Sequence, residues 1–320
     1  MSSSSLNSSK ATARYLVIKH GALGDIIQAI DAFASLRASF PEAEIHLLTT
    51  APFEKLVQMM PYFDAIHLDP RAGLSQPAAL YRLYQLLNQP WDKVIDLQNS
   101  GRTKRYQRFL APKSTWVSSH KGAVHQMPDF TGINNVERML IAVRAVGASD
   151  HTPDLAFLAD GTLPEHLTSQ LNRPYALLIP GCSLAKPSKR WPSAHYARLA
   201  TLLLEQNIQP VLIGTKADQA AIDALASAVP EALNWMGQTS LTDLMILAHG
   251  AVLSVGNDTG PTFVAARAGQ PVVMVMGADT DPSMSAPKGA KAGYLKEDAI
   301  ASVQPEAVLE KARELGLARP

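Results

Sequence analysis

Residues 255–261 read Val-Gly-Asn-Asp-Thr-Gly-Pro and join a predicted strand to a predicted helix. The apolar run at 251–255 is typical of a strand that is buried on both faces. Pro261 opens an alanine-rich helix that is closed by Gly269. A polar turn between a strand and a helix N-terminus is a natural anion site. A simple helix cap by Asp258 or Thr259 is an equally good interpretation of this turn alone.

Strands and helices alternate on both sides of this turn. Further strands are predicted at residues 15–18, 44–49, 65–68, 93–97, 175–179, 210–213 and 271–276. Helices are predicted at 26–39, 52–60, 77–87, 135–146, 193–206, 217–228, 241–248 and 305–315. This alternation predicts an α/β protein with parallel sheets and right-handed crossovers.

The chain of 320 residues is longer than one hydrophobic core usually serves, so two domains are expected. The alternation is interrupted where proline and glycine recur between 151 and 174. We therefore predict an N-terminal domain at 13–160, a C-terminal domain at 161–303 and a last helical segment at 304–320. Residues 1–12 are polar, rich in serine and without an apolar run, which predicts a disordered tail and no signal peptide.

Composition limits the class of protein. Hydrophobic residues make up 47% of the chain, enough to bury large parallel sheets, and the net charge is only +1. No global field would recruit nucleic acid. The single Cys182 excludes an internal disulfide and fits a reducing cytoplasm. No apolar run approaches the roughly 18 residues of a membrane span, so any membrane contact is expected to be peripheral.

A second polar turn follows the first predicted strand, where residues 19–25 read Lys-His-Gly-Ala-Leu-Gly-Asp. Its two glycines allow a tight turn and a close ligand. Their spacing is not the Gly-x-Gly-x-x-Gly pattern of dinucleotide binding, which disfavours an NAD-dependent enzyme. Asp25 would repel a pyrophosphate but would suit a hydroxyl that must lose a proton. It is equally suited to cap the following helix.

A basic loop follows the small-residue turn at 180–183. Lys186, Lys189 and Arg190 lie within five positions, and such a cluster neutralises phosphates well. The Gly-Lys spacing of a P-loop is absent, so an NTPase of that type is not indicated. From charge alone, a solvated basic loop is the slightly better interpretation.

A basic segment follows the predicted strand at 93–97. Arg102, Lys104, Arg105 and Arg108 lie within seven positions and could hold an acidic partner such as a phosphorylated lipid. Four cations are too few for nucleic acid without a wider basic surface. An exposed basic helix face explains them equally well.

Signals for a metal or a hydrolase are lacking. The nine histidines have no metal-ligand spacing, and Asp279 and Asp281 precede Pro282, which favours a turn. Ser183 lies in no Gly-x-Ser-x-Gly elbow. We therefore expect neither a metal ion nor another cofactor.

Taken in order, several motifs resemble the ADP-heptose:lipopolysaccharide heptosyltransferase family, glycosyltransferase family 9. The matching stretches are 16–25, the Phe-Pro-Glu-Ala turn at 40–43, Asp-Leu-Gln at 96–98, Pro-Gly at 180–181, Ser-Lys-Arg-Trp-Pro at 188–192, Thr-Ser-Leu at 239–241 and 256–261. They span nearly the whole chain after the tail.

The resemblance implies a GT-B fold, in which two Rossmann-like parallel-sheet domains face a central cleft. The N-terminal domain would take the acceptor and the C-terminal domain the nucleotide-sugar donor. The last helix would cross back to the N-terminal domain, as it commonly does in the family.

The resemblance also assigns roles. The catalytic acid-base position falls on Asp25, and the donor-phosphate lysine on Lys189. Further donor contacts fall on Ser183, Thr239, Asp258, Thr259 and Gly260. Gly24 and the basic residues Arg102, Lys104 and Arg105 are our candidates for the acceptor side.

The activity implied is inverting, metal-independent transfer of a heptose from ADP-heptose to a hydroxyl of the lipopolysaccharide inner core. Its partners would be an ADP-sugar and an acidic glycolipid, met in the cytoplasm or at the cytoplasmic face of the inner membrane. One departure concerns Phe263, since many family members carry a donor-contacting histidine there. Another nucleotide sugar or acceptor, or a non-catalytic nucleotide-binding protein of this fold, are the alternatives.

Overall fold

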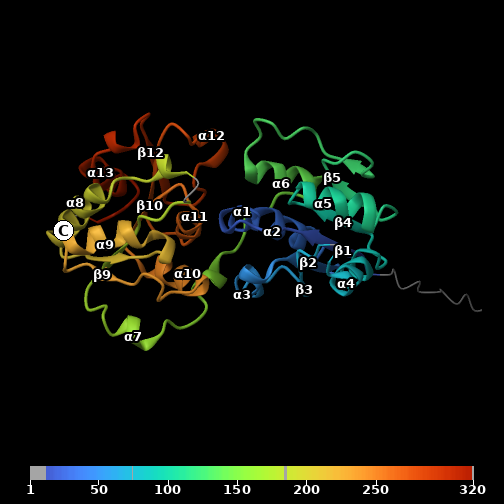
Figure 1. Ribbon diagram of the computed structural model, residues 1–320, viewed down its shortest axis with the longest axis horizontal. Helices are drawn as coiled ribbons and strands as arrows, with labels where there is room; N and C mark the ends of the chain where they lie inside the picture. The colour runs from blue at the N-terminus through green and yellow to red at the C-terminus, as the bar shows by residue number, and fades with distance from the viewer. Residues whose placement is uncertain (1–11, 74, 184–185, 319–320) are drawn as a thin grey trace, which may run out of the picture.

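The computed structural model describes residues 12–73, 75–183 and 186–318. Of the predicted tail, residues 1–11 lie outside the described residues. The N-terminal half contains a parallel sheet in the order β3-β2-β1-β4-β5-β6 (Figure 1). Its strands are β1 (Arg14–Ile18), β2 (Glu44–Thr49), β3 (Ala65–Leu68), β4 (Lys93–Asp96), β5 (Trp116–Ser118) and β6 (His125–Gln126).

The C-terminal half repeats this plan with the order β12-β11-β10-β7-β8-β9. Its strands are β7 (Tyr175–Ile179), β8 (Gln209–Leu212), β9 (Leu233–Asn234), β10 (Leu253–Asn257), β11 (Val272–Met276) and β12 (Ala292–Lys296). All strand pairs in both sheets are parallel. The predicted two-domain α/β architecture is therefore confirmed.

Helices connect the strands of the N-terminal half. They are α1 (Leu23–Gln28), α2 (Ile30–Ser39), α3 (Glu54–Gln58), α4 (Pro77–Leu87), α5 (Gly101–Arg105) with the π-helical turn η2 (Tyr106–Leu110), and α6 (Asn135–Arg144). The helix predicted at 26–39 starts earlier and is divided at Ala29 into α1 and α2. The division matters because α1 turns toward the other half.

The C-terminal half has its own set of helices. They are α7 (Glu165–Thr168), α8 (Ser193–Leu204), α9 (Gln219–Ala228), α10 (Leu241–Gly250), α11 (Gly260–Arg267), α12 (Pro282–Ser285) and α13 (Pro305–Glu314). The turn at 255–261 therefore joins β10 to α11, as its sequence predicts.

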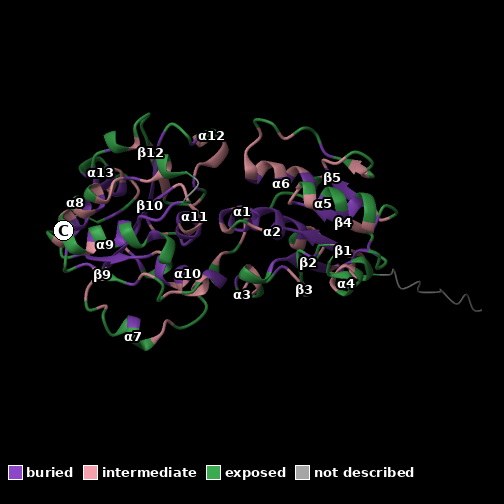
Figure 2. Cartoon of the chain, in the orientation of Figure 1, coloured by how far each residue is buried: buried purple, intermediate pink, exposed green. Residues whose placement is uncertain are grey.

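Each central strand is buried on both faces, because alternate side chains enter different cores. In β1, Val17 belongs to a core that continues into the C-terminal half, whereas Leu16 and Ile18 pack beneath α4 and η2. In β7, Leu177 faces the shared core and Leu178 faces away from it. Figure 2 shows the two buried sheets with exposed helix faces outside them. The shared core ties the two halves together.

The last helix, α13, stays with the C-terminal half. Its apolar side chains Val308, Leu309 and Ala312 pack in one cluster with residues of α8, β10 and β11. Figure 1 shows α13 beside α8. The prediction that this helix crosses back to the N-terminal domain is therefore wrong, because its apolar face is already buried on its own sheet. The division at residue 160 stays a prediction, and the short turn η3 (Ala156–Ala159) packs on α10.

Among the described residues, no helix combines the length and the apolar character that a membrane span requires.

Candidate functional site

A cavity of about 1180 Å³ lies between the two halves, at the carboxyl ends of both sheets. Open α/β sheets bind their ligands at this edge. The N-terminal half contributes residues after β1, after β4, after β6 and on α6, while the C-terminal half contributes residues after β7, after β10 and on α12. The lining includes Lys19, Gly24, Asp25, Asn99, Asp129, Asn135, Arg138, Ser183, Lys186, Lys189, Asp258, Thr259, Gly260 and Phe263.

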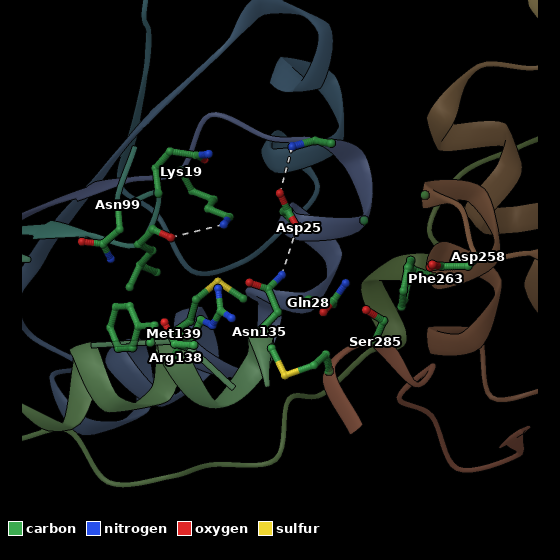
Figure 3. A pocket seen from close by; sticks show the side chains of 18 of the residues that line it. Lys19, Asp25, Gln28, Asn99, Asn135, Arg138, Met139, Asp258, Phe263 and Ser285 are labelled. Carbon is green, nitrogen blue, oxygen red and sulfur yellow. Dashed lines mark hydrogen bonds between the residues drawn. The ribbon is translucent and has the colours of Figure 1, made fainter. Parts of the chain in front are cut away.

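Asp25 is held in a defined orientation inside this cavity (Figure 3). The Ala22 N–H donates to one carboxylate oxygen at 3.2 Å, and the Asn135 side-chain amide donates to the other at 2.9 Å. Asp25 is half-buried in the first turn of α1, where a carboxylate also suits the helix dipole. Both earlier interpretations therefore apply, since the carboxylate supports the helix start and also faces the cavity.

Lys19 brings a buried cation close to Asp25. Its ammonium donates to the Leu97 carbonyl at 3.2 Å and is almost fully buried. Burial lowers the pKa of the Lys19 ammonium, and the carboxylates of Asp25 and Asp96 oppose that shift. The side chain of Arg138, on α6, reaches the same part of the cavity (Figure 3).

Two glycines allow the halves to meet beside Asp25. A Cβ atom on Gly24 would lie 2.9 Å from the Phe263 ring, and one on Gly260 would lie 2.9 Å from Cβ of Leu23. Real Cβ atoms do not approach other atoms that closely, so the N-termini of α1 and α11 come together only because both positions are glycine. Phe263, where a histidine was expected, is buried in this contact and lines the cavity.

The donor half of the predicted site is built around a partly buried ion pair. The Lys189 ammonium donates to the Asp258 carboxylate, and the hydroxyl of Thr280 donates to the same carboxylate at 2.8 Å. Both members of the pair line the cavity. Thr259 and Gly260 follow at the N-terminus of α11, with Thr259 as N-cap residue but without a side-chain capping bond. A ligand anion can use this helix end.

Asn257 fixes the two C-terminal loops against each other. Its amide donates to the carbonyl oxygens of Pro180 and Gly181, and its oxygen accepts from the Trp191 N–H at 3.0 Å. Because Asn257 is completely buried, these bonds hold the loop that carries Lys189 beside the loop that carries Asp258.

Some predicted residues lie elsewhere. Thr239 precedes Ser240, the N-cap of α10, and does not line the cavity. Arg102, Lys104 and Arg105 lie on α5, outside the cavity lining, and Arg102 donates to the Tyr106 hydroxyl. Gly24 and Ser183 do line it.

The residues that could suggest a metal have structural partners. Asp279 accepts from Ser188, and Asp281 caps α12 by accepting from the Ser283 N–H at 2.9 Å. In the described ranges, no three His, Cys, Asp or Glu side chains are grouped so that they could hold a metal ion.

Sequence reasoning missed the contribution of α6. Asn135 and Arg138 are 110 or more residues from Asp25 in the chain, in a segment that showed only a helical pattern. No local motif marks them. The spacing of three places them on one side of a helix, which would be a usable signal only if the position of that helix were known.

Residues 80–312 match the family described as glycosyltransferase family 9 (heptosyltransferase). The lipooligosaccharide heptosyltransferase 2 of Haemophilus ducreyi is 25% identical over 310 residues, covering 88% of each chain.

Two solved structures show the same fold. The Escherichia coli ADP-heptose lps heptosyltransferase II superposes with a TM-score of 0.76 and 22% identity, covering 94% of this chain and 98% of that one. A glycosyl transferase family 9 protein from Veillonella parvula reaches a TM-score of 0.80 at 19% identity, covering 95% and 97%. These likenesses confirm the predicted GT-B fold.

Proposed function

The chain belongs to glycosyltransferase family 9, and from that premise we propose that it transfers a heptose from ADP-heptose to a hydroxyl of the lipopolysaccharide inner core. It is a glycosyltransferase by family. The names of its relatives support the heptose and the lipopolysaccharide acceptor. The observation that carries the proposal is the placement of Asp25 and the Lys189–Asp258 pair in one cavity, on opposite halves.

The reaction that fits this placement is a single displacement. An acceptor hydroxyl beside Asp25 attacks the anomeric carbon, and the carboxylate takes the hydroxyl proton as general base. ADP leaves from the opposite face of the sugar, so the anomeric configuration is inverted. The hydrogen bonds from Ala22 and Asn135 orient the carboxylate before the substrate arrives.

Negative charge grows on the β-phosphate as ADP leaves. Lys189 and the N-terminus of α11 at Thr259 and Gly260 are the groups we assign to that charge. Lys189 would then exchange its bond to Asp258 for one to phosphate, leaving Asp258 with Thr280. A positive side chain and a helix dipole can stabilise the charge on the leaving ADP without a metal ion, so we propose a metal-independent reaction.

The acceptor side is proposed for the N-terminal half. Lys19, Asn99 and Arg138 present cationic and amide groups to the cavity there, which suits an acidic sugar acceptor. We place the protein in the cytoplasm, with peripheral contact to the inner membrane, because a nucleotide sugar and a lipid-linked acceptor would meet there.

A second candidate donor is another ADP-sugar, and Phe263 favours it. A buried phenyl ring lines the cavity one turn into α11 and offers no hydrogen bond. A heptose hydroxyl that bonds a histidine at this position in other members would lose that partner. A non-catalytic role fits less well, because Asp25 is both present and oriented by two hydrogen bonds.

Binding of nucleotide sugars tests which nucleotide the donor carries. ADP and ADP-heptose should raise the melting temperature, whereas UDP- and GDP-sugars at equal concentration should not, because a ligand stabilises the native state according to its occupancy. The shift should be the same with and without EDTA. A shift with UDP-sugars alone would contradict an ADP donor, and loss of the ADP shift in EDTA would contradict metal independence.

Replacement of Lys189 by alanine should weaken ADP binding about 10- to 100-fold, since a hydrogen bond to a charged group contributes about 1.5–3 kcal/mol. The variant also leaves the Asp258 carboxylate unpaired near the phosphates. Titration calorimetry with ADP measures the change. Lys186→Ala is the matched control, because Lys186 lines the same cavity but is exposed. Equal affinities for Lys189→Ala and wild type would rule out the phosphate role.

A further inference from the structure

The outer side of two N-terminal helices carries a surface that the transfer reaction does not use. Tyr81 and Tyr84 of α4 are 61% and 46% exposed, with their rings stacked at 6.4 Å between centroids. Phe109 of η2 is 67% exposed. Lys104 and Arg105 of α5 and Arg108 of η2 are exposed as well. We call this set the aromatic–basic surface: Tyr81, Tyr84, Lys104, Arg105, Arg108 and Phe109.

The helices that carry this surface are linked at their C-terminal ends and cover the same apolar cluster. The Asn88 side chain at the end of α4 donates to the Leu110 carbonyl at the end of η2, at 2.9 Å. Leu83 and Leu87 of α4 share a buried cluster with Tyr106. Figure 1 shows α4 and α5 at the end of the N-terminal half that is farther from the C-terminal half. The elements that carry the aromatic–basic surface are therefore anchored on one buried apolar cluster.

The inner side of α5 and η2 is buried and hydrogen-bonded to the rest of the protein, whereas the outer side is available to a partner. Thr103 and Tyr106 are buried, and the Tyr106 hydroxyl donates to the Asp69 carboxylate at 2.7 Å. Among the described residues, Lys104, Arg105 and Arg108 form no ion pair with a carboxylate. Arg108 instead lies over the Phe109 ring, 5.1 Å from its centroid.

Charge is strongly segregated around this surface. Residues 70–91 and 97–128 contain eight Lys and Arg and no Asp or Glu. The rest of the chain holds the other 21 Lys and Arg and all 28 Asp and Glu. The small net charge of the whole protein therefore conceals a basic region on a more acidic body. Such a region attracts an extended anionic surface and orients the protein toward it.

We propose that the aromatic–basic surface docks the protein on an anionic phospholipid bilayer. Exposed tyrosine and phenylalanine rings suit the interface between headgroups and acyl chains, where one side of the ring is apolar and the other is wet. Lysine and arginine beside them are drawn to the anionic headgroups, each contributing roughly a fivefold gain in binding. Both kinds of side chain occur here together, without acidic neighbours on α4, α5 or η2.

The surface is also connected to the cavity. Asn99 lines the cavity, and the next residue, Ser100, is the N-cap of α5. The basic helix thus begins at the rim of the cavity and leads away from it. Docking through this helix would hold the rim close to the headgroups, where a lipid-linked acceptor presents its sugars. This last step rests on the proposed function, whereas docking itself is measured without acceptor.

Vesicle sedimentation tests the docking. Wild type should bind vesicles of phosphatidylglycerol and phosphatidylcholine, should bind pure phosphatidylcholine much less, and should be released as salt rises. The variant K104Q/R105Q/R108Q should bind the anionic vesicles about 100-fold more weakly. The control K216Q/K291Q/K296Q removes three exposed cations from the C-terminal half and should bind like wild type. Equal loss in both variants, or equal binding to both vesicles, would overturn the proposal.

A second variant tests the rings. Y81S/Y84S/F109S should lose binding to anionic vesicles while keeping the salt dependence of what remains, and binding like wild type would overturn the role of these side chains. If the surface instead bound a protein partner, wild type should bind both kinds of vesicle weakly, and that result would also overturn the proposal. Each variant is titrated with ADP as well. Vesicle binding without ADP binding in wild type would refute the proposed function and leave docking intact, and the reverse result would refute docking alone.

Discussion

Replacement of Asp25 by asparagine is expected to slow sugar transfer by about 10²- to 10⁴-fold, the usual contribution of a general base. The asparagine oxygen can still accept the bond from the Ala22 N–H that supports the start of α1. It cannot take the proton of the attacking hydroxyl. The loss should therefore appear in kcat, while ADP affinity stays near that of wild type. Single-turnover transfer assays and ADP calorimetry measure the two quantities.

Asp129 provides the matched control for this variant. It lines the same cavity, and its carboxylate is bonded to Thr131 at the exposed rim. Asp129→Asn removes the same charge from the same cavity without touching the carboxylate assigned to catalysis. If both variants lost transfer activity equally, the loss would come from the changed charge of the cavity and not from a missing general base. If Asp25→Asn transferred at the wild-type rate, the general-base assignment would be wrong.

Of the substitutions proposed, Asp31→Ala is expected to have the largest effect on stability. It should lower the free energy of unfolding by about 3–5 kcal/mol. Asp31 lies on α2 in the N-terminal half and accepts from Arg267 of α11 and, at 2.7 Å, from Lys288. Asp31 and Arg267 are both buried. Without Asp31 the guanidinium would be left buried and unpaired, which costs far more than the loss of an exposed pair. Urea denaturation measures the change.

Two further variants show whether the cost comes from the unpaired charge. The double variant Asp31→Leu, Arg267→Met should recover most of the stability, since apolar side chains of similar size can replace a buried pair. Lys288 is half-exposed and can return to solvent. Glu306→Ala breaks the exposed Arg198–Glu306 pair and should change stability little. A double variant as unstable as Asp31→Ala would point to packing and not to charge.

The strands that the sequence predicts are the ones with long apolar runs, such as β1, β7, β10 and β11. The strands it does not predict are β5, β6, β9 and β12. Three of these have only two or three residues, too few to show a period, and β12 is an edge strand with mixed exposure. Hydrophobic pattern identifies a strand only when both faces are buried over several residues.

Site residues divide along a similar line. Asp25, Asp258, Thr259 and Gly260 belong to the polar turns that follow predicted strands, so their position at one edge of a sheet follows from the chain order. Asn135 and Arg138 follow no strand, and only the fold brings α6 over the cavity. Thr239 was predicted as a donor contact because its motif resembles that of the family, yet it does not line the cavity.

By itself, the sequence determined two parallel sheets and the polar turns at their strand ends, because both depend on residues that are neighbours in the chain. Only the tertiary structure decided which turns face each other. It joins Asp25 to Asn135 across 110 residues, Lys189 to Asp258 across 69 and Asp31 to Arg267 across 236. It also keeps α13 on its own domain. The first two pairings depend on how elements pack within one half, and the third depends on how the two halves pack. Local periodicity and turn chemistry carry no information about either kind of packing.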